Sequence, residues 1–255
     1  MDILTIDQVR SNYNEFRDII NTQFTGERTA RLNKLYDDYS VRLKTAPASS
    51  YDYFHNAFPG GYCDHILRVV KFAKATYKLW KMAGMYLDNF TEEELIFSAL
   101  NHDLGKLGLP GDNLDKYILN KSDWHVKNQG KLYENNGNLP HVTISDTTMY
   151  ILHRYGIDMS LNEYLTIKIH DGVYDDANKP YYTGFNIDSK MKSTLPIIMH
   201  HADMMASRFE FERWAQATGK FNLSSLPEWE NLRKIKNTID NPITKETTPL
   251  NFDNL

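Results

Sequence analysis

Residues 91–106 read TEEELIFSALNHDLGK, the pattern of an amphipathic helix that ends in polar residues. Thr91 and Glu94 have the spacing of a capping box, in which each side chain satisfies a backbone N–H of the first helical turn. One broad face of this helix carries, at helical spacing, Leu95, Ala99, His102, Asp103 and Lys106. An apolar stripe therefore runs directly into an imidazole, a carboxylate and an ammonium group.

The adjacent His102 and Asp103 are the first candidates for chemistry. A buried imidazole beside a buried carboxylate is costly unless another group pairs with them, and a divalent metal ion is a suitable partner. The pair offers one nitrogen and two carboxylate oxygens, enough to hold one ion and to bridge to another. A His–Asp dipeptide alone is equally compatible with a simple charge pair at a helix end, so the rest of the chain has to decide.

Helical periodicity dominates the chain. Apolar residues recur every three or four positions over 5–20, 28–44, 61–85, 143–155, 160–170, 193–217 and 225–238. The Gly-, Asn- and Asp-rich stretch 108–142 predicts mostly loop with one short helical piece, and residues 171–190 predict a long loop. Almost no segment has the alternation of a strand, so the sequence predicts an all-α fold.

Composition narrows the class of protein. The 255 residues include 29 Lys and Arg against 33 Asp and Glu, a formal net charge of −4, which argues against a broad basic face for duplex DNA. Cys63 is the single cysteine, so a disulfide framework and cysteine-based metal sites are excluded, and the nine histidines carry the metal-ligating potential. No apolar run approaches the about 20 residues that span a bilayer, and the N-terminus does not read as a signal peptide. We therefore expect a cytoplasmic protein with no membrane partner.

Two further segments carry candidate ligands. The stretch FHNAFPGGYCDHILRVV, residues 54–70, places His65 near a helix start, with Arg68 one turn later on the same side. Far downstream, Asp203 lies in the middle of an apolar helix, where a carboxylate needs a counter-charge.

The order of a lone His, then His-Asp-x-Gly-Lys, then a distant Ala-Asp resembles the HD-domain superfamily of metal-dependent phosphohydrolases. Residues 54–70 are similar to the branch that contains exoribonucleases and relaxase-associated proteins. The resemblance spans residues 46–212 and implies a helical bundle. We expect an HD-type domain over 46–217, an N-terminal helical extension over 1–45 packed on it, and a C-terminal helix and tail over 218–255.

The resemblance implies a site for two divalent transition-metal ions. Its primary ligands would be His65, His102, Asp103 and Asp203. His141 and His170 would complete the second site, with Asp103 bridging the ions. His125 and His153 are alternatives to His141, because no motif aligns residues 108–142. Imidazole and carboxylate ligands suit Mn, Fe, Ni, Co or Zn better than Mg.

The residues expected to act on substrate surround these ligands. Asp103, Lys106 and Arg68 are the predicted catalytic residues, and Lys106 and Arg68 would each hold a phosphate oxygen. The predicted substrate contacts also include His55, His200, Tyr181 and Tyr182. Each of these residues also has a purely structural interpretation. Lys106 and Arg68 could be solvated surface charges, and His55 and His200 a loop and a core histidine. The two tyrosines could simply pack against other side chains.

The leading functional hypothesis is a phosphohydrolase that cleaves a phosphoester of a nucleotide or a short single-stranded nucleic acid through a metal-activated hydroxide. The net charge of −4 and the lack of a separate β-rich oligonucleotide-binding domain favour a small nucleotide. Two alternatives use the same residues: a di-iron oxygenase of the HD type, and a non-catalytic HD module that senses a nucleotide. The exact substrate and the oligomeric state are left open.

Overall fold

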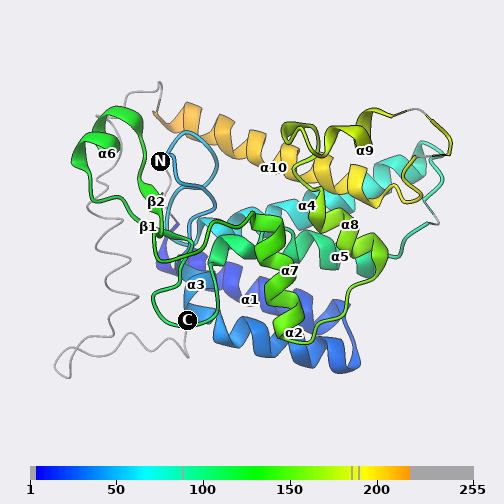
Figure 1. Cartoon of the computed structure of the whole chain (residues 1–255), viewed down its shortest axis with the longest axis horizontal. Helices are drawn as coiled ribbons and strands as arrows, with labels where there is room; N and C mark the ends of the chain where they lie inside the picture. The colour runs from blue at the N-terminus through cyan, green and yellow to red at the C-terminus, as the bar shows by residue number, and fades with distance from the viewer. Residues whose placement is uncertain (1–3, 88, 185, 189, 219–255) are drawn as a thin grey trace.

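The computed structural model describes residues 4–87, 89–184, 186–188 and 190–218, and over these residues it confirms the all-α prediction (Figure 1). The α-helices are α1 (Ile6–Gln23), α2 (Gly26–Asp38), α3 (Ser40–Thr45), α4 (Gly61–Met82), α5 (Glu92–Asn101), α6 (Asp123–Gln129), α7 (Ile144–Arg154), α8 (Leu161–Lys168), α9 (Lys179–Thr183) and α10 (Leu195–Thr218). Two 3₁₀ turns are η1 (Leu104–Leu107) and η2 (Gly172–Tyr174). The expected helix over 225–238 and the expected tail lie outside the described residues.

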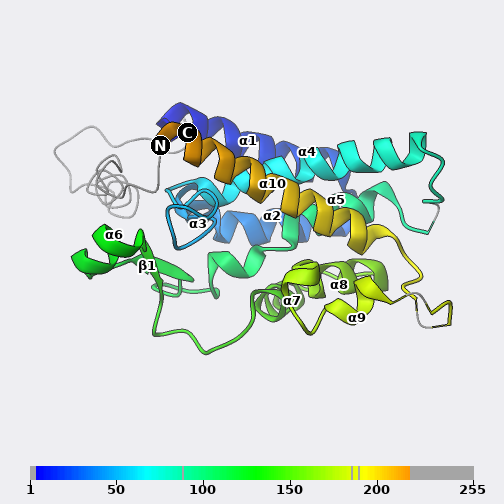
Figure 2. The same ribbon diagram turned by 90° about the horizontal axis from the view of Figure 1, so that it is seen from above.

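One apolar core joins helices from both ends of the described chain. α4 packs against α1, α5 and α10, and α10 lies along α4 in both views of the molecule (Figures 1 and 2). The N-terminal helices share this core: Phe16 of α1 and Tyr36 of α2 are fully buried, with ring centroids 4.7 Å apart. The site-bearing helices are therefore backed by the same packed interior.

The sequence pattern over 28–44 predicts one helix, but the structure divides it at Tyr39. Tyr39 has φ −99° and ψ 10°, so α2 ends at Asp38 and α3 begins at Ser40. The Tyr39 hydroxyl donates a hydrogen bond to the carbonyl of Gly108, 3.0 Å away. This long-range bond ties the helical break to the segment that follows the His–Asp pair.

The stretch predicted as mostly loop contains the expected short helix, α6, and a small sheet that periodicity did not indicate. Strands β1 (Tyr117–Leu119) and β2 (Tyr133–Asn135) are antiparallel, with Ile118 opposite Glu134. We call residues 117–135 the β-lobe. Its own small apolar cluster includes Ala57, Phe58, Val126, Leu132 and Tyr133. The β-lobe therefore packs on the loop that precedes α4. Among the helices described, none combines the length and apolar character required to traverse a lipid bilayer.

Candidate metal centre

Four separate segments bring their polar residues to one buried place. His65 comes from α4, the His102–Asp103 pair directly follows α5, His170 lies just beyond α8, and Asp203 is on α10. The ring centroids of His65 and His102 are 5.9 Å apart, and those of His102 and His170 are 4.9 Å apart. Exposure is at most 2 % for the three histidines and Asp103. Five of the six predicted ligands thus meet in one place.

The ligand atoms form two overlapping groups, each within 4.8 Å: His65, His102 and Asp203, and then His102, Asp103 and His170. The carboxylate of Asp103 spans both groups. Its Oδ2 lies 3.7 Å from Nε2 of His65 in the first group, and its Oδ1 lies 3.5 Å from Nε2 of His170 in the second. A carboxylate with one oxygen toward each group has the position that a bridging ligand needs.

Each of the three histidines uses its second ring nitrogen to hold its orientation. Nδ1 of His102 lies 3.0 Å from the carbonyl oxygen of Ala99, and Nδ1 of His170 lies 2.9 Å from that of Ile167. Nδ1 of His65 lies 3.1 Å from Oε2 of Glu210. This leaves Nε2 directed inward. Nε2 of His65 and His102 is buried and makes no hydrogen bond, although carboxylate oxygens of Asp203 and Asp103 lie 3.2 Å and 3.3 Å away. Metal-binding histidines show this arrangement, so these residues fit a divalent ion.

The carboxylates dominate the electrostatics of the centre. Burial alone would lower the pKa of His65, but Glu210 and Asp203 outweigh it and raise that pKa to about 10. For His170, burial is again outweighed, here by Asp103 and Asp171, and the pKa rises to about 9. Burial would raise the pKa of Asp103, yet Lys106 and His102 hold it well below its usual range. The site therefore favours positive charge, as a cation site must.

Lys106 lies at the edge of the centre because the chain tightens after α5. Helix α5 ends at Asn101, earlier than the pattern over residues 91–106 predicts, and Asp103, at φ −106°, leads into η1. Lys106 Nζ consequently lies 2.7 Å from Asp103 Oδ2 and 3.3 Å from His55 Nε2. Burial, followed by the Lys106 charge, holds the pKa of His55 well below its ordinary value, so the neutral imidazole accepts from the ammonium.

Gly105 allows α7 to approach this turn. Its N–H donates to Thr148 Oγ1 at 2.8 Å, and a Cβ at this position would lie 2.4 Å from the carbonyl oxygen of Ile144. We expect Gly105→Ala to lower the free energy of unfolding by about 1–3 kcal/mol, because α7 must move away from the turn. Urea denaturation measures this change. The control is Gly137→Ala, where a Cβ meets nothing within 4 Å. Equal stability of the two variants would contradict the packing argument.

Arg68 contacts two carboxylates of the chain. Its guanidinium is only 15 % exposed, forms an ion pair with Asp64 at 2.9 Å and makes a short contact with Glu210 Oε1. Both contacts use the same nitrogen, Nη1. Arg68 therefore supports Glu210, which in turn holds His65.

His141 is the one predicted ligand that the structure does not bring to the centre. It is exposed in the segment leading to Thr143, the N-cap of α7, and belongs to neither ligand group among the described residues. The two alternatives do not replace it: His125 lies on α6 with its ring against Trp124, and His153 is exposed on α7. The second ligand group is formed instead with His102.

Two predicted substrate contacts lie behind His170. Nδ1 of the buried His200 is 3.2 Å from the His170 carbonyl, and the Tyr182 hydroxyl donates to the carbonyl of Ile169 at 2.8 Å. The rings of His200 and Tyr182 are 5.3 Å apart. Both side chains thus support the turn that carries His170, whereas Tyr181 is 48 % exposed.

Two acidic residues of the centre were not predicted. Glu210 lies seven positions after Asp203, a spacing that places both side chains on one helix face. This spacing is the feature of the sequence from which Glu210 could have been predicted. Its carboxylate holds the Nδ1 side of His65. Asp171 follows His170, and its Oδ1 lies 3.7 Å from Nε2 of that histidine. Its side chain is 56 % exposed, so it marks the solvent side of the second ligand group.

Known proteins provide no further guide to this arrangement. No protein-family model, curated protein or solved structure matches this chain. The resemblance to the HD-domain superfamily therefore rests on the motifs themselves, and the role of the site has to be argued from its geometry.

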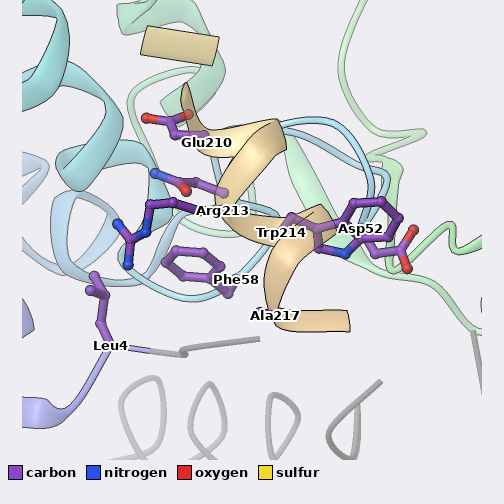
Figure 3. A pocket seen from close by; sticks show the side chains of 8 residues that line it. Leu4, Asp52, Phe58, Glu210, Arg213, Trp214 and Ala217 are labelled. Carbon is purple, nitrogen blue, oxygen red and sulfur yellow. The ribbon is translucent and has the colours of Figure 1, made fainter. Parts of the chain in front are cut away.

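A small cavity of about 30 Å³ lies on the far side of Glu210. Figure 3 shows Glu210 and Trp214 on the last turns of α10. The lining residues also include Phe58 and Asp52, from the loop that precedes α4. Asp52 is 1 % exposed, and neither carboxylate oxygen has a hydrogen-bond partner. Burial raises the pKa of Asp52 from its ordinary value of 3.8 to about 7.

This raised pKa makes stability depend on pH. Between about pH 4 and pH 7 the folded chain keeps a proton on Asp52 that the unfolded chain has lost, so the free energy of unfolding falls as pH rises. We expect Asp52→Asn to be more stable than the parent chain by about 1–3 kcal/mol at pH 8 and equally stable at pH 4. Urea denaturation at the two pH values tests this, with the exposed Asp112→Asn as control. A gain that is equal at both pH values would refute it.

Proposed function

We propose that this chain is a metal-dependent phosphohydrolase of the HD type that cleaves a phosphoester of a nucleotide or a short single-stranded nucleic acid. The observation that supports it most is the pair of ligand groups that share His102. The Asp103 carboxylate faces His65 at 3.7 Å and His170 at 3.5 Å, and the Lys106 ammonium lies 2.7 Å from its Oδ2. Two cation sites beside a fixed ammonium suit a substrate with several negative oxygens.

His65, His102 and Asp203 would hold one divalent ion. Because Nδ1 of His102 is held by the Ala99 carbonyl, its Nε2 can serve only one ion, and a second ion would have Asp103 and His170 as its ligands. The imidazole and carboxylate donors favour Mn, Fe, Ni, Co or Zn. When bound, such ions supply a hydroxide nucleophile at neutral pH and neutralise charge that develops on a phosphoryl oxygen. The buried Nε2 atoms of His65 and His102, which lack hydrogen-bond partners, support this assignment.

The chain itself contributes orientation and charge. Lys106 would hold a non-bridging phosphate oxygen as a point charge, and His55, which accepts from its ammonium, would keep that ammonium directed at the site. Glu210 and the carbonyls of Ala99 and Ile167 hold the three imidazoles in place. These groups need little rearrangement when a substrate binds, which is how an active site lowers the cost of reaching the transition state.

The substrate class follows from charge. The net charge of −4 favours a small nucleotide over a long nucleic acid, because a long phosphate backbone needs many basic contacts. A single cysteine, Cys63, buried and free, is consistent with a reducing cytoplasmic compartment, which we propose as the place of action.

A metal-by-substrate screen of the full chain tests the proposal. The chain is purified without oxygen, stripped with a chelator and reloaded with Mn²⁺, Fe²⁺, Co²⁺, Ni²⁺ or Zn²⁺. It is then assayed under nitrogen on nucleoside mono-, di- and triphosphates, cyclic nucleotides and short oligonucleotides. We expect phosphoester cleavage that disappears with the chelator. No turnover with any pair of metal and substrate would refute the proposal, and oxygen consumption with a mixed-valent di-iron signal would favour the oxygenase.

A further inference from the structure

Three aromatic rings cluster on the loop that precedes α4. The ring centroid of Phe54 lies 5.2 Å from that of Tyr51 and 4.9 Å from that of Tyr53. We call residues 51–54 the aromatic loop. Phe54 is 47 % exposed, although it has two aromatic neighbours. About half of this large apolar ring is therefore open to a ligand.

The aromatic loop lies directly beside the metal centre. His55 follows Phe54 across one trans peptide, so their Cα atoms are about 3.8 Å apart. The His55 ring is 4.9 Å from the His65 ring, and its Nε2 is 3.3 Å from the Lys106 ammonium. His55 therefore connects Phe54 to Lys106, the group that would hold a phosphate.

The backbone of this loop is held from both sides. The Asp52 N–H donates to the carbonyl of Gly130 at 2.9 Å, and the Tyr133 N–H donates to the carbonyl of Ser50 at 3.1 Å, which ties the loop to the β-lobe. On the other side the Ala48 N–H donates to the carbonyl of Asn56 at 3.1 Å. A ring on a fixed backbone loses little freedom on binding, which favours contact with a flat ligand.

We propose that Phe54, with Tyr51 and Tyr53 behind it, is a stacking platform for the base of the substrate whose phosphate lies at Lys106. This inference rests on the proposed function and specifies its substrate as one that carries a nucleobase. Aromatic rings stack on bases with little dependence on base identity, because every base has a π face. The platform therefore tolerates different bases and binds purines more tightly than pyrimidines.

Binding is tested first, without any need for turnover. The probe is 2-aminopurine deoxyriboside 5′-monophosphate, whose fluorescence is quenched by stacking, added to the Mn²⁺-loaded full chain. We expect quenching in the parent chain and in Phe54→Tyr, and about tenfold weaker binding with loss of quenching in Phe54→Ala. The control is Tyr174→Ala, which removes a ring that is 63 % exposed on the loop after His170. Unchanged quenching in Phe54→Ala would overturn the platform.

Kinetics then separate base recognition from phosphate recognition. For a nucleoside monophosphate, Phe54→Ala should raise KM about tenfold and leave kcat within twofold. For ribose 5-phosphate, which lacks the base, neither parameter should change. An equal loss on both substrates would mean that Phe54 only supports the loop. Quenching by the parent chain without any hydrolysis would leave the platform standing and refute the hydrolase proposal, so the two failures are distinguishable.

Discussion

Replacing Asp103 with Asn is expected to lower kcat/KM by at least about a thousandfold, or about 4 kcal/mol of transition-state stabilisation. Asp103 is 2 % exposed, and its oxygens face His102 and His170 as well as the Lys106 ammonium. The amide keeps the shape of the side chain but removes the negative charge that joins the two ligand groups. Lys106 then remains buried beside a neutral group, and the affinity for divalent ions falls with it.

Three measurements follow this variant. Steady-state kinetics measure the loss of rate, elemental analysis measures the bound metal, and the shift of melting temperature on adding a chelator measures how far the metal stabilises the fold. The parent chain should lose stability with the chelator, and Asp103→Asn should not respond. The matched control is Asp146→Asn on α7, whose carboxylate bonds to Lys168 instead of the metal centre. Full metal content and full activity in Asp103→Asn would remove Asp103 from the site.

Glu210 is expected to be the most sensitive position outside the ligands. It is 3 % exposed and accepts from both His65 and Arg68. Glu210→Ala should lower the free energy of unfolding by about 3–5 kcal/mol, because it leaves the buried imidazole and guanidinium without this shared carboxylate. Glu210→Gln keeps an acceptor for His65 but loses the charge, and metal affinity should fall about 10- to 100-fold.

The two Glu210 variants separate folding from metal binding. Urea denaturation of the metal-free chain reports stability, and titration calorimetry with Mn²⁺ reports affinity. Glu212→Gln, an exposed neighbour on α10, is the control for a lost charge on the same helix. If Glu210→Gln bound Mn²⁺ as tightly as the parent chain, the carboxylate would have a packing role only.

Sequence reasoning predicted best where local physics is strong. The capping box of Thr91 and Glu94 is present, and its helix carries His102 at its C-cap, still in helical conformation, with Asp103 directly after it. Asp203 could be identified because a carboxylate among apolar residues of one helix needs a partner, and the structure places it 3.2 Å from His65 Nε2. Both inferences depend only on residues within one helix.

Features that depend on distant contacts were not accessible in this way. Arg68 has the spacing of a substrate cation, but its partner Glu210 is 142 residues further along the chain. His141 lies in a stretch where no periodicity predicts the path of the chain, and the β-lobe forms there from two three-residue strands. Phe54 drew no prediction of its own, since only the fold shows that its loop leads into His55 beside His65.

The separation in sequence of the ligands makes the metal centre a potential cross-link. His65 lies on α4 and Asp203 on α10, two helices far apart in the sequence, and His65 already contacts Glu210 across 145 residues. An ion that binds both helices in the folded chain, and has no such site in the unfolded chain, would stabilise the fold by mass action. A chain whose one cysteine is buried and free would thus have a reversible cross-link between two helices. Its contribution to the free energy of unfolding would rise with the concentration of metal in the cell.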